Sequence, residues 1–175
     1  MIFMKKLMWI PLLSLISCAS ATDYRSMTVP KVDLDQFFDR WYVWSNIPNF
    51  IEKGCTNSVE AYTWNKKEKR IDIDFTCMKD GEKKSYPQKG WVFDKERNSH
   101  WKVQLFWPLK FNYLIVYIAP DYSATVVTVP DGSLIWIMGK NAAVDEKQYA
   151  EIIDLLKSKG YDLKELERVP QKWDL

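Results

Sequence analysis

The sequence predicts an all-β fold, an eight-stranded antiparallel up-and-down barrel with one C-terminal α-helix packed on its wall. Three observations predict it: short runs rich in aromatic and β-branched residues recur at regular spacing, apolar and polar residues alternate within them, and one helical pattern follows near the C-terminus. The chain has 175 residues, 47% of them hydrophobic, which is enough for one domain with a substantial core. We expect that domain to cover residues 31–175.

Eight runs have the composition and length of strands. Alternation is plainest over residues 71–75, where apolar side chains are separated by aspartates, so that one face must be buried. The charged loop 65–69 is short enough to join the second and third strands as a hairpin. The expected strands are residues 41–46, 57–64, 70–77, 86–93, 100–106, 112–119, 123–129 and 133–139.

The remaining elements lie at the two ends of this series. Residues 32–38 predict a turn or a single helical turn, and residues 166–169 a short last strand. Between the barrel and that strand, residues 145–159 predict a helix, and Gly160 is well placed to end it. We expect the helix to bury an apolar stripe against the barrel, formed by Tyr149, Ile152, Ile153, Leu155 and Leu156.

The N-terminus predicts export. Lys5 and Lys6 precede an apolar stretch over residues 7–16, which is too short to span a bilayer and is typical of a signal peptide at residues 1–17. Residues 15–18, Leu-Ile-Ser-Cys, resemble the lipobox of bacterial lipoproteins. We therefore expect Cys18 to be lipidated, residues 18–30 to form a lipidated N-terminus and polar tether, and the protein to lie at the outer membrane. Cleavage after Ala21 is the alternative, which would give a periplasmic or secreted soluble protein.

Two further cysteines, Cys55 and Cys77, remain in an oxidising compartment after either cleavage. Folding the hairpin about loop 65–69 brings them opposite each other. We expect a disulfide between them, with two free thiols as the alternative.

Three separated segments resemble the motifs of the lipocalin family. Residues 39–42 are similar to its Gly-x-Trp-Tyr opening, with Asp39 in place of the glycine. Asp121 and Tyr122 are similar to its Asp-Tyr turn, and residues 134–140 to its final strand, with Lys140 in place of the arginine. The resemblance implies that Lys140 lies over the indole of Trp41 at the closed end of the barrel. The segments 50–55, 106–108 and 160–162 further resemble the bacterial outer-membrane lipoprotein branch, which is similar to apolipoprotein D.

An eight-stranded barrel of this kind is wide enough to hold one small ligand. Loop 47–51 is expected to form an apolar lid at its mouth, and a bulge in the second strand would let Glu60 act as a polar handle. For each expected lining residue, plain core packing is the alternative. Strand alternation and family position predict a lining of Val43, Glu60, Tyr62, Ile71, Ile73, Phe75, Trp101, Val103, Leu105, Tyr113, Ile115 and Tyr117.

The expected function is that of a membrane-anchored lipocalin that stores or transports apolar ligands in envelope lipid maintenance. Fatty acids and lysophospholipids are the expected ligands, although aromatic side chains also suit retinoids, haem or bilins. The net charge of +2 offers no field that would attract nucleic acid, and we expect a monomer or weak dimer without a cofactor.

Catalysis is not expected. The chain has one histidine, His100, so there is no two-histidine metal site and little choice of general base. A cysteine-dependent lipid isomerase remains an alternative if Cys55 or Cys77 is a free thiol. A structural or interaction lipoprotein, with a barrel filled by its own side chains, is the other alternative.

Overall fold

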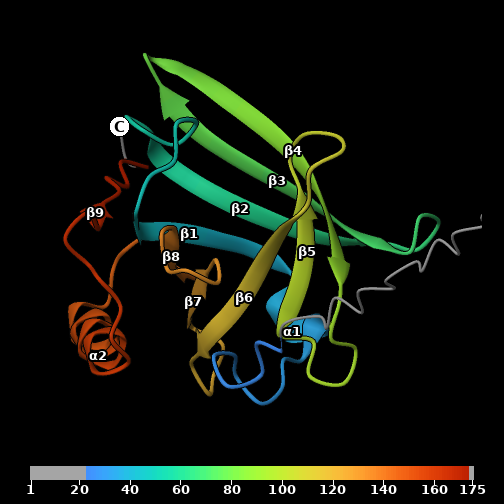
Figure 1. The fold of residues 1–175 in the computed structure, drawn as a ribbon. Helices are drawn as coiled ribbons and strands as arrows, with labels where there is room; N and C mark the ends of the chain where they lie inside the picture. The colour runs from blue at the N-terminus through green and yellow to red at the C-terminus, as the bar shows by residue number, and fades with distance from the viewer. Residues whose placement is uncertain (1–22, 174–175) are drawn as a thin grey trace, which may run out of the picture.

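The computed structural model describes residues 23–173, so the expected signal peptide and Cys18 lie outside the described residues. The strands wrap around one another into a barrel, with the C-terminal helix beside it (Figure 1). In chain order the elements are α1 (Leu34–Phe37), β1 (Asp39–Asn46), β2 (Thr56–Asn65), β3 (Arg70–Lys79), β4 (Glu82–Val92), β5 (His100–Gln104), β6 (Phe111–Ile118), β7 (Ala124–Thr128), β8 (Ile135–Gly139), α2 (Glu146–Ser158) and β9 (Glu167–Arg168).

The strand order confirms the predicted fold class. Each strand from β2 to β8 pairs with the next, β8 pairs with β1, and β1 pairs back to β2, so that the barrel closes. All of these pairings are antiparallel. The short β9 adds to β1 where β1 has left β2. Each barrel strand therefore has a partner on both sides, which removes the open sheet edges that invite aggregation.

The barrel strands contain three register shifts, one of them in β1 between Val43 and Ser45, and the other two decide the facing of predicted lining residues. One lies in β2 between Thr56 and Val59, and it allows Cys55 and Tyr62 to belong to the same interior cluster. The other lies in β6 between Ile115 and Tyr117. Beyond it Tyr117 packs in the outer cluster beside α2, so its predicted place in the barrel interior is wrong. Simple alternation fails there because a bulge reverses the facing of every later residue.

The core therefore has two parts. The first fills the barrel, and the second lies between the outer face of the wall and α2, which buries Ile152 and Leu156. Asp145 caps α2 by accepting hydrogen bonds from the backbone of Lys147 and Gln148. The expected helix and its packing on the wall are thus present.

The closed end of the barrel is sealed by α1 and Trp41. The Trp41 indole donates a hydrogen bond to the Phe37 carbonyl at 2.7 Å, and Lys140 Nζ lies 4.2 Å from the centre of the Trp41 ring. Tyr122 accepts a hydrogen bond from the Asp33 backbone at the start of α1. Asp121 does not reach this contact, and instead accepts from Ser123 within its own turn.

The segment leading to α1 is docked on the barrel rather than free. The Arg25 guanidinium forms salt bridges with the carboxylates of Asp94 and Glu96, with N–O distances of 3.2 and 2.8 Å. The backbone of Val29 donates to the Ile115 carbonyl at 3.0 Å. These contacts begin within residues 18–30, where a free tether is expected, so the part of this segment from Asp23 onward lies on the barrel. It meets the barrel at the closed end, where α1 and the β4–β5 loop lie (Figure 1).

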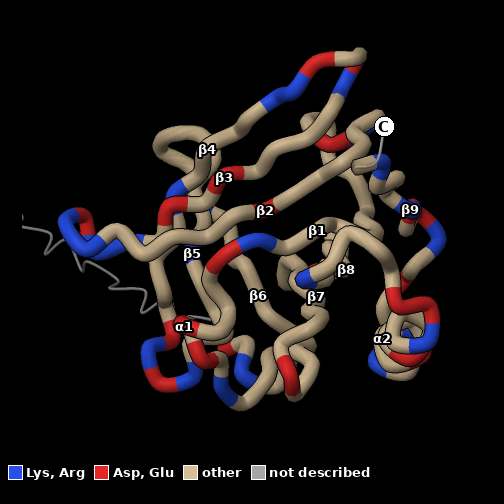
Figure 2. Tube along the Cα trace, turned by 180° about the vertical axis from the view of Figure 1, so that it is seen from behind, with Lys and Arg blue, Asp and Glu red and all other residues tan. Residues whose placement is uncertain are grey.

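Charged residues are unevenly distributed over the barrel. Figure 2 shows them on the β2–β3 and β3–β4 turns, along β3 and β4, on α2 and around the closed end, whereas β6, β7 and β8 carry none. Within residues 23–173, no helix has both the length and the apolar character needed to cross a bilayer.

Candidate functional site

A cavity of about 200 Å³ opens at the end of the barrel opposite α1. The β1–β2 and β5–β6 loops border it. A larger groove of about 690 Å³ lies outside the barrel beside the end of α2, but it is a surface hollow with many polar groups. We take the barrel cavity as the candidate site because its walls are mainly apolar. They are formed by Asn49, Phe50, Ile51, Glu52, Glu60, Phe75, Tyr86, Gln88, Val103, Leu105, Phe106, Phe111, Asn112, Tyr113, Val129, Leu134 and Trp136.

The twelve residues predicted to line the cavity fall into three groups. Tyr117 lies outside the barrel, as described above. Those that line the cavity are Glu60, Phe75, Val103, Leu105 and Tyr113. Those that are buried in the barrel core without lining it are Val43, Tyr62, Ile71, Ile73, Trp101 and Ile115.

An aromatic cluster accounts for the second group, because it fills the lower half of the barrel. Trp101 stacks on Tyr113 with ring centres 5.2 Å apart and planes 11° from parallel. Phe37 packs against Trp41, Tyr62 and Trp101, with ring centres 5.2 to 5.3 Å from its own. These rings plug the barrel from α1 up to the floor of the cavity, which limits a ligand to the upper half.

Glu60 and two tyrosines form a polar floor. The Tyr62 hydroxyl donates to Glu60 Oε2, and the Tyr113 hydroxyl bonds to the Tyr62 hydroxyl. Glu60 is only 5% exposed. Burial, with a smaller contribution from the negative charge of Glu52, raises the pKa of Glu60 to about 8. Burial also raises the pKa of Tyr113, so this hydroxyl stays a hydrogen-bond donor at neutral pH.

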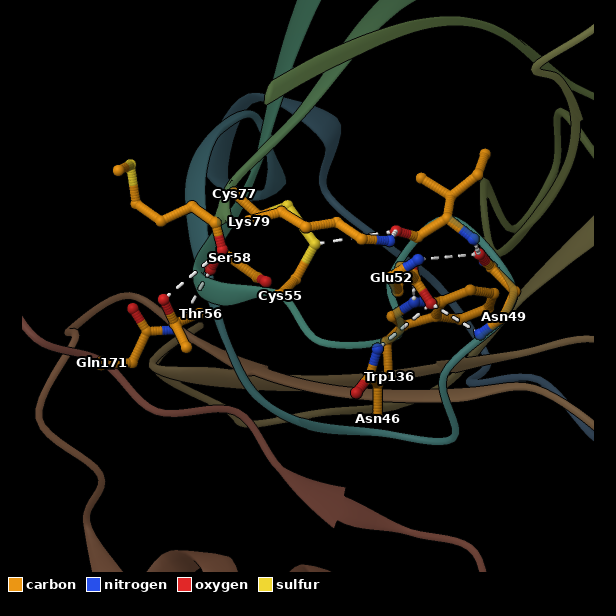
Figure 3. Close-up of a disulfide and its surroundings, with 12 residues drawn as sticks. Asn46, Asn49, Glu52, Cys55, Thr56, Ser58, Cys77, Lys79, Trp136 and Gln171 are labelled. Carbon is orange, nitrogen blue, oxygen red and sulfur yellow. Dashed lines mark hydrogen bonds between the residues drawn. A yellow bond between two sulfur atoms is a disulfide. The ribbon is translucent and has the colours of Figure 1, made fainter. Parts of the chain in front are cut away.

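A second buried carboxyl, Glu52, lies in the wall, and Figure 3 shows its donors converging on it. Its oxygens accept from Trp136 Nε1 at 2.7 Å, from Asn46 Nδ2 at 3.1 Å and from the Asn49 backbone at 3.2 Å. Burial raises the pKa of Glu52, while these donors act in the opposite direction. Glu52 and Trp136 are not among the residues predicted to line the cavity. Residues 135–138 are all apolar, so alternation could not show which of them face inward.

A disulfide joins Cys55 and Cys77 beside this cluster, with a Cα–Cα distance of 5.6 Å (Figure 3). This confirms the predicted pairing. It ties the β1–β2 loop to β3, next to Lys79, which donates to the Ile51 carbonyl at 3.0 Å. Because the bond uses both thiols, the cysteine-dependent isomerase alternative loses the nucleophile on which it depended.

Large apolar side chains are exposed around the rim of the cavity. One comes from the β1–β2 loop, and the others come from residues 106–111, where the Trp107–Pro108 bond is cis. This surface was not predicted from the sequence, although four of the six residues 106–111 have large apolar side chains. We call the set the apolar rim: Phe50, Phe106, Trp107, Leu109 and Phe111.

Comparisons with known proteins agree with this architecture. The model of the lipocalin-like domain family matches residues 32–171. The chain is 24% identical to temperature-induced lipocalin-1 of Arabidopsis thaliana over 160 residues, which is 86% of each protein.

Among solved structures, it is similar to H1 crustacyanin of the lobster Homarus americanus, at 15% identity and a TM-score of 0.63, over 89% of this chain and 88% of the other. It is also similar to insecticyanin of the tobacco hornworm Manduca sexta, at 14% identity and a TM-score of 0.62, over 84% of this chain and 85% of insecticyanin. These structures show the same fold. Since the family model covers most of the sequence and the barrel is closed as in these structures, the chain belongs to the family of lipocalin-like domains.

Proposed function

We propose that this protein binds small apolar ligands in the mouth of its barrel and stores or transports them at an envelope membrane. The observation that carries the proposal is the apolar cavity, which lies at the open end of a fold suited to holding one small ligand. The apolar rim supports it, because exposed apolar patches of this kind mark sites of contact with ligands, membranes or proteins.

Fatty acids and lysophospholipids are the proposed ligand class, because one acyl chain matches apolar walls. At about 30 Å³ for each water-sized group, the cavity holds only about seven non-hydrogen atoms. A long chain would therefore lie partly in the cavity and partly across the apolar rim.

The membrane part of the proposal rests on the sequence around Cys18. Lipidation there, in the manner of bacterial outer-membrane lipoproteins, would hold the protein at the outer membrane with more than one acyl chain, which makes anchoring stable. Replacing Cys18 with alanine should move the protein from the membrane fraction to the soluble fraction. It should leave ligand binding unchanged, because the described barrel begins beyond that residue.

Native mass spectrometry of the protein purified from its own envelope, followed by organic extraction, tests the ligand part. We expect a bound lipid-sized mass that is lost on extraction and restored by adding single-chain lipids. A Trp136→Ala variant should change the affinity for the added lipid, and Trp173→Ala, at an exposed position away from the cavity, should not.

One observation favours a second candidate function. The aromatic plug and the small cavity are what a structural or interaction lipoprotein with a filled barrel would have. A barrel that is isolated empty and does not take up added lipids would favour this second function over transport.

A further inference from the structure

The cavity lining contains acidic side chains but no basic ones, a feature that the proposed function does not use. Two of its residues, Glu52 and Glu60, carry carboxyl groups. None of the described residues that line it is lysine, arginine or histidine. Lys79 and Lys102 contact lining residues, through the Ile51 carbonyl and the Asn112 side chain, but neither lines the cavity itself.

The two carboxyl groups differ in what they can offer a ligand. The Glu52 carboxyl already accepts hydrogen bonds from three donors in the wall, so it acts as a fixed structural acceptor rather than as a group free to bind ligand. Glu60 accepts a hydrogen bond at Oε2 from the Tyr62 hydroxyl, and Tyr113 also acts on this carboxyl as a hydrogen-bond donor. A carboxylate has room for about four hydrogen bonds, so Glu60 can accept further donors. Its place on the cavity floor makes it the group that an entering polar end would meet.

Aromatic rings surround the same space. Cations are attracted to the faces of such rings, more strongly where water is excluded. A carboxylate ligand would instead meet two buried acidic groups and no positive partner, which disfavours its charged form. The rings that line the cavity are Phe75, Tyr86, Phe111, Tyr113 and Trp136, with Phe50 and Phe106 at its border.

We propose that this cavity selects amphiphiles whose polar end is an ammonium group over those that end in a carboxylate, with Glu60 as the group that pairs with the cation. The inference rests on the proposed function and narrows its ligand class at that same site, from single-chain lipids in general to those that end in an ammonium group rather than in the carboxylate of a fatty acid. The ammonium end enters first and reaches the floor, and the apolar chain lies between the aromatic walls and continues over the apolar rim. This orientation also accommodates a chain longer than the cavity.

Three probes with the same chain and different ends test the proposal: n-octylammonium, n-octan-1-ol and n-octanoate. Their binding to the full mature protein is measured by isothermal titration calorimetry at pH 8.5, where the floor carboxyl is largely ionised. We expect octylammonium to bind at least about tenfold more tightly than octanoate, with octanol between them. Equal affinities, or tighter binding of octanoate, would overturn the proposal.

The variant Glu60→Gln keeps the shape of the side chain and removes its charge. It should bring the affinity for octylammonium to within about twofold of that for octanol, while octanol still binds. The matched control is Glu82→Gln, an exposed glutamate on the first residue of β4, which should leave all three affinities unchanged. An unchanged preference for octylammonium in Glu60→Gln would contradict the assignment of Glu60.

The outcomes also separate this inference from the proposed function. If octanol binds and the head group makes no difference, the cavity is a ligand site and only the ammonium preference is wrong. If none of the three probes binds, the cavity is not a site for single-chain ligands, and both proposals fail.

Discussion

At the scale of single residues, Asp39 has a backbone conformation that is unfavourable for a residue with a side chain. It opens β1 with a φ of 93°, in the left-handed region that favours glycine and strains other residues. The lipocalin motif that residues 39–42 resemble has glycine at this position. The departure visible in the sequence therefore has a structural cost at the closed end of the barrel.

The variant Asp39→Gly should be more stable than the natural protein, by about 1 kcal/mol, because relief of strain exceeds the added freedom of the unfolded chain. The lost attraction to Lys140 is small, since Asp39 is exposed. Equilibrium unfolding in urea measures the change. Asp35→Gly in α1, where glycine is unfavourable, should instead lower stability. A destabilised Asp39→Gly would show that the aspartate makes a contact worth more than its strain.

Glu60 should make stability depend on pH. Its pKa is about 8 when folded and about 4.3 in an unfolded chain, so the unfolded chain loses this proton first. Its contribution to stability is therefore complete below about pH 4 and is lost as the pH rises to about 8, at on the order of 1 kcal/mol per pH unit. The raised pKa of Glu52 acts in the same direction.

The free energy of unfolding, measured from pH 5 to pH 8.5, should fall for the natural protein and fall less for Glu60→Gln. Glu82→Gln is the control, since the pKa of that exposed group is lowered by its contact with Lys84. Parallel pH profiles for the natural protein and Glu60→Gln would mean that the floor carboxyl does not titrate in this window.

At the scale of elements, the contact between β1 and β8 depends on a glycine, Gly139, which has no side chain. The ring of Trp44 lies directly over Gly139, where an added Cβ would come within 1.9 Å of Trp44 Cζ2. Trp44 is held in place by a hydrogen bond from its indole to the Asn141 carbonyl at 2.8 Å. The two strands can pair here only because position 139 has no side chain.

Gly139→Ala should therefore cost about 3 kcal/mol of stability, the upper part of the range for overpacking. Gly90→Ala is a matched control in the barrel wall, where the nearest atom is the flexible end of Ile73 at 3.2 Å, and a smaller loss is expected. Thermal unfolding compares the two. Adding Trp44→Phe to Gly139→Ala should recover part of the loss, and an absence of recovery would contradict the proposed clash.

The disulfide should stabilise the hairpin of β2 and β3 and the loop before it. For a loop of 22 residues, closing the bond restricts the unfolded chain by about 3 kcal/mol. Replacing Cys55 and Cys77 together with alanine should lower the free energy of unfolding by about that amount. The same protein should then show no further change on adding a reducing agent, whereas the natural protein should become less stable. Equal stability of the two in the absence of reductant would contradict this role.

The elements also show what a sequence can predict. Repeated alternation predicted the barrel, and an apolar stripe at helical spacing predicted the helix, because burial of one face leaves a local pattern in the sequence. The place of Tyr117 was wrong because one bulge reverses the facing of residues, and a bulge has no such pattern. Trp101 was predicted to line the cavity but belongs to the aromatic plug. Facing alone gives no depth along the barrel axis, so the small size of the cavity could not be predicted.

At the scale of the whole molecule, the two ends of the barrel have different roles. The apolar rim and the cavity occupy one end, and α1 with the docked residues from Asp23 onward occupies the other (Figure 1). The five peptide steps from Cys18 to Asp23 reach at most about 18 Å. The ten residues of β2 alone extend about 33 Å. A lipid on Cys18 would thus be tied to the end that has no opening.

A longer linker should change how an anchored protein exchanges its ligand. Inserting about fifteen glycine and serine residues after Thr22 should speed the transfer of a fluorescent single-chain lipid from the anchoring vesicle into the barrel. Stopped-flow fluorescence measures the rate, and the soluble Cys18→Ala protein, with and without the insertion, is the control. Equal rates for the short and long anchored proteins would show that the short linker does not restrict access.

If Cys18 carries a lipid, the docking of Arg25 on Asp94 and Glu96 would place that anchor beside the closed end of the barrel. Standing on its closed end, the protein would point its opening away from the leaflet that holds it and toward whatever lies across the aqueous space. The protein would then exchange ligand with a second membrane rather than with the membrane that anchors it. Ligand transfer would run from one membrane of the compartment to the other.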